Sequence, residues 1–242
     1  MDLPTRIDLV CIVDCDSANV LEVKERENMA QVILDLGSGN SCQNDWKIAK
    51  KMIDEIKKVD TGRHSIVLKW QLFEKAGDNI PLDREIFKKA YDYAEKKGYR
   101  TTSSVFDKES LDFLMQFDVP FIKLANNRDL DWLIGEIPRK VPLVISYGSV
   151  EELKAAPPMT GNFQRLLCVS DYPADLEKYE QAFDLAYYVS CGYGISDHTA
   201  DFELWNKYQP PVIEWHFVLE HDENNLDGGL FARIPAQLSE VL

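Results

Sequence analysis

No stretch of this 242-residue sequence is apolar over the length that a membrane-spanning helix needs. Its first residues, Met1-Asp2-Leu3-Pro4, also lack the basic segment and apolar core of a secretory signal. Cysteine is scarce, and the five cysteines are scattered and odd in number, which is typical of reduced thiols rather than of a disulfide framework. We therefore expect a cytoplasmic protein that does not associate with a membrane.

Positive charge is in short supply as well. Lysine and arginine number 27 against 41 aspartates and glutamates, which gives a formal net charge of -14 and a pI near 4.7. This balance disfavours binding to nucleic acid or to anionic lipid, so we expect neither as a partner. An anionic substrate would instead need its own local cluster of lysine or arginine side chains.

Linker-like and low-complexity segments are absent, and short β-rich runs alternate with helical segments in about eight units from Val32 onward. This pattern predicts a single α/β domain, a (β/α)8 TIM barrel, over residues 32–242. The alternative is a doubly wound open sheet, but the first strand-to-helix turn lacks the GxGxxG fingerprint. Residues 1–31 are expected to form an N-terminal extension, with a hairpin built from residues 9–14 and 20–23.

The expected strands cover residues 32–36, 65–70, 101–105, 120–124, 142–146, 165–169, 187–191 and 211–217. The expected helices cover residues 46–56, 83–97 and 110–117, and further helices are expected near Leu130, Glu151, Leu176, Phe202 and Ile234. Barrel enzymes carry their chemistry at the carboxyl ends of the strands. The polar residues at these ends are therefore the candidate site residues.

Histidine is rare too, with four in the chain, yet two of them follow apolar, β-rich runs near the C-terminus. They lie in the segments Gly194-Ile195-Ser196-Asp197-His198-Thr199 and Val212-Ile213-Glu214-Trp215-His216-Phe217. Two neutral imidazoles, completed by a carboxylate or water, can hold a divalent metal ion that polarises a carbonyl oxygen. Asp227 is a further acidic candidate. The alternative is a pair of buried histidines that are hydrogen-bonded to the backbone.

Two lysines end strands that are otherwise apolar. Lys69 lies in Ile66-Val67-Leu68-Lys69-Trp70, and Lys123 lies in Phe121-Ile122-Lys123-Leu124. An ammonium group that points into a barrel mouth needs an anionic partner, because an unpaired buried charge is costly. Glu214 is expected to form such an inward ion pair with a lysine. The two lysines, Arg128 and the neighbouring hydroxyls together predict a cradle for phosphate and carboxylate groups.

The order of several motifs resembles the sialic acid synthase family, barrel enzymes that condense phosphoenolpyruvate with an N-acyl amino sugar. The early motifs are Leu34-Asp35-Leu36-Gly37, Leu68-Lys69-Trp70-Gln71, Ser103-Ser104-Val105-Phe106-Asp107 and Val119-Pro120-Phe121-Ile122-Lys123-Leu124. The strongest likeness runs from Cys168-Val169-Ser170-Asp171-Tyr172-Pro173-Ala174 through Ser196-Asp197-His198-Thr199 to Ile213-Glu214-Trp215-His216-Phe217. The resemblance covers the chain from about Val32 to its end.

This resemblance implies a role for each matching residue. His198 and His216 would ligate a Mn²⁺- or Mg²⁺-type ion that binds the aldehyde oxygen of the sugar. Lys69 and Ser104 would face the carboxylate of phosphoenolpyruvate, and Lys123, Ser146 and Ser196 would hold its phosphate. Tyr172 and Asp227 would contact the sugar, and Asp35 stands where the family has a glutamate near the reacting carbons. The resemblance also implies a homodimer.

The sequence departs from the family pattern after the Lys123 strand. Asn126 and Arg128 stand where the family has a serine and a catalytic glutamate, and Arg128 would instead grip an additional anionic group of the substrate. We also expect the protein to lack the C-terminal antifreeze-like domain of the family. Three hypotheses follow. The first is a divergent synthase that condenses phosphoenolpyruvate with another aldehyde, that of a sugar or of a phosphorylated or nucleotide-linked sugar. The others are a barrel lyase or aldolase with altered chemistry and a catalytically inactive binding or scaffold protein.

Overall fold

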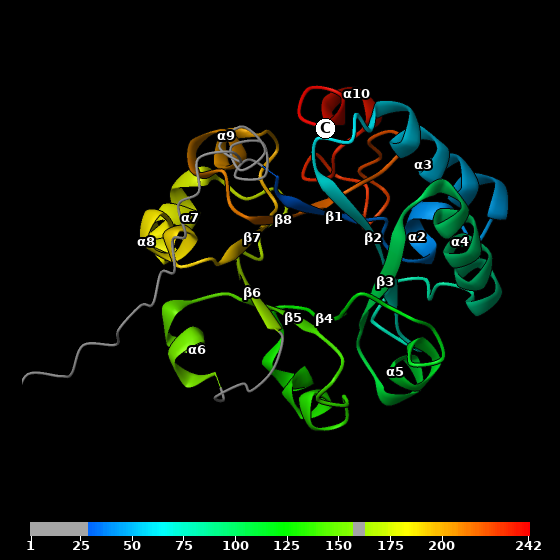
Figure 1. Cartoon of the computed structure of the whole chain (residues 1–242), viewed down its shortest axis with the longest axis horizontal. Helices are drawn as coiled ribbons and strands as arrows, with labels where there is room; N and C mark the ends of the chain where they lie inside the picture. Colours follow the sequence, from blue (N-terminus) through cyan, green and yellow to red (C-terminus); the bar gives the residue numbers. More distant parts are fainter. Residues whose placement is uncertain (1–28, 157–162) are drawn as a thin grey trace, which may run out of the picture.

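A computed structural model describes residues 29–156 and 163–242 of the chain. Eight parallel strands close into a barrel in the order of the sequence (Figure 1), which confirms the predicted TIM barrel. The strands are β1 (Gln31–Asp35), β2 (Ser65–Leu72), β3 (Arg100–Val105), β4 (Ile122–Leu124), β5 (Leu143–Tyr147), β6 (Phe163–Cys168), β7 (Gly194–Asp197) and β8 (Val212–His216). The barrel closes because β1 pairs with both β2 and β8. The hairpin expected in residues 9–23 lies outside the described residues.

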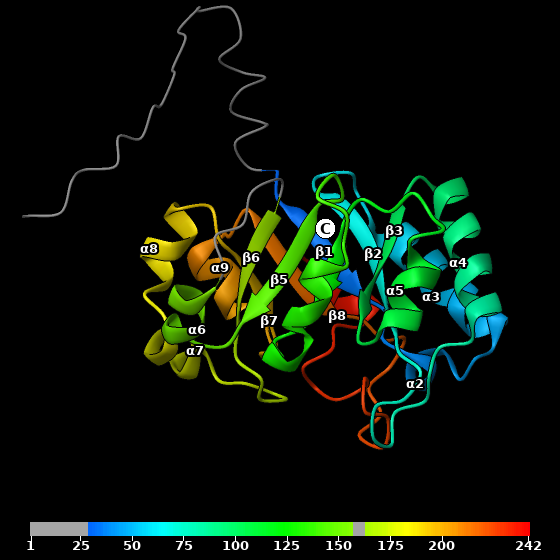
Figure 2. The same cartoon turned by 90° about the horizontal axis from the view of Figure 1, so that it is seen from below.

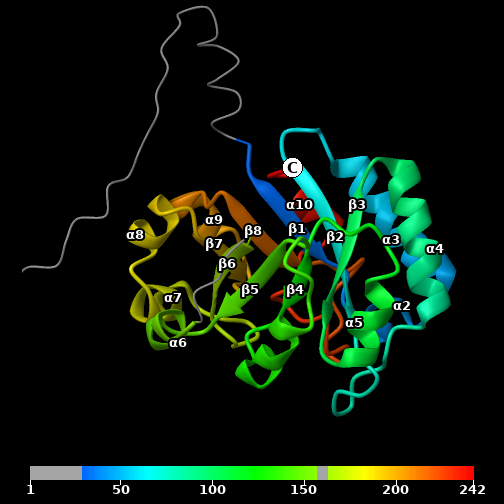
Figure 3. The ribbon, with the colours of Figure 1, turned by 60° about the horizontal axis from the view of Figure 1, so that its bottom comes forward.

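Helices surround the barrel on its outer face (Figures 1 and 3). They are α2 (Gly39–Cys42), α3 (Trp46–Val59), α4 (Arg84–Lys97), α5 (Lys108–Leu114), the 3-10 helix η1 (Arg128–Gly135), α6 (Val150–Ala155), α7 (Leu176–Ala182), α8 (Leu185–Ser190), α9 (Glu203–Tyr208) and α10 (Pro235–Leu238). Local signals set their ends. For example, the Asp83 side chain accepts from two backbone amides at the start of α4, and Gly98 ends that helix with a φ of 91°.

None of the helices in the described part of the chain combines the length and the apolar character needed to cross a membrane. Figure 2 shows the barrel from the side, with the segments that follow β2 and β8 extending beyond the same end of the strands. This end is the carboxyl end of the barrel, where the polar strand-end residues lie.

An apolar layer fills the amino-terminal half of the barrel interior. Its members are Ile33, Val67, Phe121, Val144, Leu166 and Val212, which form a cluster separate from the core under the helices. Side chains along a strand alternate between its two faces, so the residue two positions later also points inward. Those later positions hold Asp35, Lys69, Lys123, Ser146, Cys168 and Glu214. The barrel therefore carries a polar layer directly above an apolar plug.

One predicted strand is wrong. Residues 187–191 form the end of α8 and its C-terminal cap, and the seventh strand begins only at Gly194. The Asp184 side chain caps α8 by accepting from the Tyr187 amide, which favours the helix over the strand that the aromatic residues suggested. The true strand is short, and a side chain at Gly194 would meet the Val212 carbonyl oxygen at 2.6 Å. Close contact between β7 and β8 therefore requires glycine at this position.

Candidate functional site

A cavity of about 330 Å³ opens at the carboxyl ends of the strands, a volume suited to a small ligand. All but one of the predicted site residues line it: Asp35, Lys69, Ser104, Lys123, Asn126, Ser146, Tyr172, Ser196, His198, His216 and Asp227. They come from every strand or from the turn that follows it, so the closed barrel brings together residues far apart in the sequence. Arg128 does not line the cavity.

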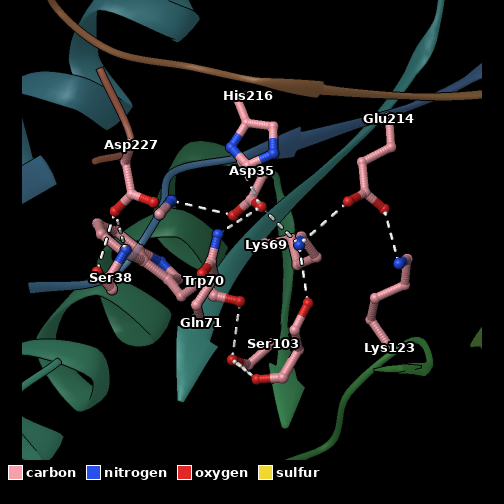
Figure 4. Close-up of polar contacts among 12 residues, drawn as sticks. Asp35, Ser38, Lys69, Trp70, Gln71, Ser103, Lys123, Glu214, His216 and Asp227 are labelled. Carbon is pink, nitrogen blue, oxygen red and sulfur yellow. Dashed lines mark hydrogen bonds and ion pairs between the residues drawn. The ribbon is translucent and has the colours of Figure 1, made fainter. Parts of the chain in front are cut away.

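Buried ion pairs join the two lysines at the floor of the cavity (Figure 4). The Lys69 Nζ lies 2.7 Å from Asp35 Oδ2 and 3.2 Å from Glu214 Oε1, and it donates to Ser104 Oγ at 2.8 Å. The Lys123 Nζ lies 3.6 Å from Glu214 Oε2 and donates to Ser146 Oγ at 2.8 Å. Glu214 therefore bridges the two lysines, which confirms the predicted inward ion pair.

The opposite charges in this network shift the pKa values of its members. Burial raises the pKa of Asp35, but the Lys69 ammonium and His216 outweigh it and lower that pKa to about 2. Burial also raises the pKa of Glu214, yet both lysines bring it below its ordinary value. For Lys69, burial lowers the pKa, but Asp35 and Glu214 raise it above the usual value, whereas for Lys123 burial prevails and its pKa is lowered. Both carboxylates are therefore ionised at neutral pH.

The two histidines at the ends of β7 and β8 are neighbours in the cavity lining. Their ring centroids are 5.3 Å apart. The Nδ1 of His198 lies 2.7 Å from the Val169 carbonyl oxygen, and burial lowers the pKa of His198 to about 3, so its imidazole is neutral at neutral pH. The Nδ1 of His216 is buried without a hydrogen-bond partner, 3.6 Å from Asp35 Oδ2. Imidazole nitrogens are ligands that divalent ions commonly use in proteins.

Residues 29–156 and 163–242 contain no cluster of three or more histidine, cysteine, aspartate or glutamate side chains able to hold a metal ion. Two imidazoles can hold a divalent ion when water or substrate completes its coordination. On the chemistry of these donors, the pair fits such an ion.

Aromatic rings form one wall of the cavity. The Tyr172 ring lies 4.3 Å from the His198 ring and 5.0 Å from the Phe231 ring, measured between centroids. Phe231 also packs 5.1 Å from His216. Sequence motifs did not indicate Phe231, because it lies in the irregular segment after β8 and only the folded chain places it here. These rings fix the orientation of the imidazoles.

Asp227 is held in one orientation by the turn after β1. Its Oδ2 accepts from the Ser38 amide at 2.9 Å, the Ser38 hydroxyl at 3.0 Å and the Ser41 hydroxyl at 3.1 Å. This approach needs glycine at position 37, which has a φ of 74° and whose side chain would lie 2.5 Å from Asp227 Oδ2. Sequence motifs did not single out Ser38. All three of these hydrogen bonds involve Oδ2, so they do not occupy Oδ1 of Asp227, which lines the cavity.

Arg128 lies beside the cavity rather than in it. Its guanidinium stacks 4.5 Å from the Tyr147 ring centroid and donates to the Ser146 carbonyl at 2.6 Å. It also pairs with Asp131 at 3.3 Å and with Glu152 at 3.8 Å. The expectation that Arg128 grips a substrate anion is therefore not supported, because its charge is directed to neighbouring groups. Arg128 instead braces the strand end that carries Ser146.

We expect Arg128→Glu to destabilise the fold without creating synthase activity toward an N-acyl amino sugar. The new carboxylate would face Asp131 and Glu152 and would lose the stacking on Tyr147, so the free energy of unfolding in urea should fall by about 1–3 kcal/mol. Arg139→Glu, on an exposed loop, is the matched control and should change stability little. A stable Arg128→Glu variant with new activity would place residue 128 in the reaction.

The sequence profile of the NeuB family matches residues 47–241. The chain belongs to the NeuB family. This family of sialic acid synthase-like barrels comprises phosphoenolpyruvate-utilising synthases, and its enzymes typically depend on a metal ion. Family membership therefore agrees with the resemblance inferred from the motifs. No match is found among the curated proteins.

Solved structures share the barrel at low sequence identity. The N-acetylneuraminic acid (sialic acid) synthetase from Leptospira borgpetersenii serovar Hardjo-bovis matches with a TM-score of 0.72 and 20% identity, covering 88% of this chain and 81% of that one. The spore coat polysaccharide biosynthesis protein spsE from Bacillus subtilis matches with a TM-score of 0.71 and 19% identity, covering 88% and 66%. A truncated 3-deoxy-D-arabino-heptulosonate 7-phosphate synthase from Thermotoga maritima matches with a TM-score of 0.59 and 12% identity, covering 88% and 84%. These similarities establish the fold.

Proposed function

We propose that this chain condenses phosphoenolpyruvate with the aldehyde of an uncharged sugar, giving a 2-keto-3-deoxy acid and inorganic phosphate. The observation that carries this proposal is the joint presence, in one cavity, of a lysine pair bridged by Glu214 and a pair of neighbouring histidines. The lysine pair suits a small anion with two charged ends. The histidine pair suits a divalent ion next to that anion.

Phosphoenolpyruvate would be held by its two charged ends. Lys69 and Ser104 would bind the carboxylate, since their side chains already meet at 2.8 Å on neighbouring strands. Lys123, Ser146 and Ser196 would bind the phosphate, with Asn126 at its edge. Ammonium and hydroxyl donors form strong, charge-assisted hydrogen bonds to such oxygens. Glu214 would keep the two lysines in place before the substrate arrives, so little reorganisation is needed.

The condensation forms one carbon–carbon bond and breaks one carbon–oxygen bond. The C3 carbon of phosphoenolpyruvate attacks the aldehyde carbon, and the aldehyde oxygen takes up a proton. Water then adds at C2, and the bond between C2 and the phosphate oxygen breaks to release inorganic phosphate. Asp35 stays ionised beside Lys69, so it can accept a hydrogen bond from the attacking water and orient it, and the proton of that water passes to the departing phosphate. A divalent ion on His198 and His216 would supply electrophilic activation of the aldehyde.

The charge of the cavity supports an acceptor without a phosphate group. Among the described residues, the lysine and arginine side chains that line the cavity are Lys69 and Lys123, and phosphoenolpyruvate would engage both. The rest of the polar lining includes amides, hydroxyls, two imidazoles and three carboxylates, those of Asp35, Glu214 and Asp227, and Arg128 lies outside. A second phosphate would be buried without a cationic partner and would face a carboxylate, which is costly. Hydroxyls of a neutral sugar would instead find acceptors and donors.

Phosphate release from phosphoenolpyruvate with Mn²⁺ tests this proposal. Neutral aldoses and N-acylated amino sugars should be compared with their phosphorylated counterparts in matched pairs. We expect release with a neutral member of a pair, and at least about a tenfold lower kcat/KM for its phosphorylated form, which corresponds to about 1.4 kcal/mol. Lys123→Ala should weaken phosphoenolpyruvate binding in calorimetry by about 1.5–3 kcal/mol, the value of a charge-assisted contact.

Other outcomes would separate the remaining hypotheses. A preference for the phosphorylated acceptors would overturn the acceptor class and leave the synthase assignment intact. Silence with every acceptor, while phosphoenolpyruvate still binds, would favour a lyase or aldolase with altered chemistry. Silence without phosphoenolpyruvate binding would favour a binding or scaffold protein.

A further inference from the structure

Arg233 joins the two segments that carry the histidines. Its backbone extends the end of β8: the Arg233 amide donates to the His216 carbonyl at 2.7 Å, and the Val218 amide donates to the Arg233 carbonyl at 3.0 Å. Its side chain is fully buried and reaches toward the turn after β7. There Nη1 donates to the Thr199 carbonyl at 2.6 Å, and Nη2 donates to Asp197 Oδ2 at 3.0 Å and to the Asp201 carbonyl.

The partner of Arg233, Asp197, is tied to both strands as well. Its Oδ1 accepts from the amide and the hydroxyl of Thr199 at 2.8 and 2.7 Å. Its Oδ2 accepts from the Trp215 indole at 2.9 Å in addition to the guanidinium. The residues on both sides of His198 are therefore fixed by this ion pair, and so is the residue that precedes His216.

We propose that Arg233 is the positioning residue of the histidine pair, and that its guanidinium sets the separation and orientation of the two imidazoles. This inference rests on the proposed function only in assigning the pair to a divalent ion. Arg233 also donates to the Phe231 carbonyl at 3.2 Å, and the Phe231 ring packs 5.1 Å from His216 and 6.5 Å from His198. The buried Arg233 side chain thus contacts both the turn after β7 and the segment that carries Phe231.

Arginine is suited to this role by its shape as much as by its charge. Its planar fork presents several donors in fixed directions, and here they reach the groups around His198. The flat guanidinium also lies 4.9 Å from the Phe202 ring and 6.0 Å from the Trp215 ring. A lysine could neutralise Asp197 but could not make the fork or the stacking. Arg233→Lys therefore separates charge neutralisation from positioning.

The test compares Arg233→Lys with the wild-type chain and with a control, Arg165→Lys. Arg165 also stacks on aromatic rings, 4.5 Å from Phe163 and 5.8 Å from Tyr193, but lies on β6 away from the histidines. We expect Arg233→Lys to weaken Mn²⁺ binding about 10- to 100-fold in calorimetry, the usual effect of losing a partner that orients metal ligands. Phosphoenolpyruvate affinity without metal should change much less, since Lys69, Ser104, Lys123 and Ser146 lie on β2 to β5 and Ser196 alone among the predicted ligands lies on β7.

A second readout needs no metal. In ¹H–¹⁵N spectra of the metal-free protein, the imidazole signals of His198 and His216 should shift or broaden in Arg233→Lys and stay unchanged in Arg165→Lys. Unchanged Mn²⁺ affinity together with unchanged imidazole signals would overturn the proposal. So would an equal loss of Mn²⁺ and phosphoenolpyruvate affinity, because that result indicates general loosening of the barrel.

Two further outcomes are also decisive. If wild-type protein binds no Mn²⁺, the metal assignment of the proposed function fails, and the imidazole signals alone decide the role of Arg233. If Arg233→Lys does not fold, the double variant Asp197→Asn with Arg233→Met replaces it. The double variant removes both charges, so no unpaired charge remains buried. Wild-type imidazole signals in the folded double variant would overturn the proposal.

Discussion

Replacing Lys69 with methionine is expected to lower the free energy of unfolding by about 3–5 kcal/mol and to abolish phosphoenolpyruvate binding. The Lys69 ammonium lies between Asp35 and Glu214, and all three side chains are almost completely buried. Removing the cation leaves two carboxylates at the cavity floor with Lys123 as their remaining ammonium partner there, 3.6 Å from Glu214. Urea denaturation at neutral pH measures the first effect and calorimetry the second.

The pH dependence of this variant gives a signature of the lost cation. In the wild type, Lys69 holds the pKa of Asp35 at about 2, below its usual 3.8, so this stabilising contribution is lost as pH falls through that range. Without the ammonium, burial should raise the carboxylate pKa values, and the folded variant should then bind protons more readily than the unfolded chain. The stability deficit of Lys69→Met should therefore shrink as the pH is lowered from about 7 to about 5.

A matched control is Lys88→Met. Lys88 pairs with Glu85 on α4, and both side chains are largely exposed, so this pair should contribute less than about 1 kcal/mol. A loss at Lys69 no larger than the loss at Lys88 would mean that the buried network does not support the fold. A deficit that does not change with pH would mean that Asp35 and Glu214 have another partner in the variant.

The sequence predicts the barrel because strands alternate with helices along the chain. It predicts most of the cavity lining because side chains along each strand alternate between the two faces of the sheet. An inward apolar residue such as Ile33 or Val67 is followed two positions later by an inward polar residue, here Asp35 or Lys69. Once the barrel is recognised, the inward residues at the strand ends can be predicted from the sequence of each strand alone. The β/α order supplies that recognition, and closure of the sheet then brings these positions into one cavity.

The remaining features depend on contacts between loops, which no local pattern encodes. Arg128 follows the Lys123 strand and was expected to point inward, but the Tyr147 ring and the Glu152 carboxylate hold it outside. Phe231 and Arg233 belong to an irregular segment after β8, and their burial arises from packing against the turn after β7. The misassigned strand at residues 187–191 has the same origin, because the Asp184 cap rather than aromatic content decides its conformation.

Removing either cavity histidine should abolish metal binding while the barrel stays folded. His198→Ala and His216→Ala each take away one imidazole from a pair whose ring centroids are 5.3 Å apart. One remaining nitrogen cannot hold a divalent ion tightly, so elemental analysis should find metal in the wild type and little in either variant. Loss of this activation, worth several kcal/mol, should slow turnover by about a thousandfold or more.

Phosphoenolpyruvate binding distinguishes this loss from general damage to the site. Neither substitution removes a predicted phosphoenolpyruvate ligand. Lys69, Ser104, Lys123 and Ser146 belong to β2 to β5, and Ser196 on β7 is retained in both variants. Calorimetry without metal should therefore give the wild-type affinity for phosphoenolpyruvate in both variants.

His221→Ala provides the matched control for the histidine variants. Its Nε2 bonds to the Ala232 carbonyl at 2.9 Å, and His221 does not line the cavity. Metal content should therefore stay at the wild-type level in this variant. If His198→Ala and His216→Ala also keep their metal, the ion is bound elsewhere and the histidines serve the fold. If all three variants lose their metal equally, metal binding depends on the overall structure of the segment after β8 and not on the two cavity histidines in particular. Loss in the two cavity variants alone would assign the ion to the pair at the ends of β7 and β8.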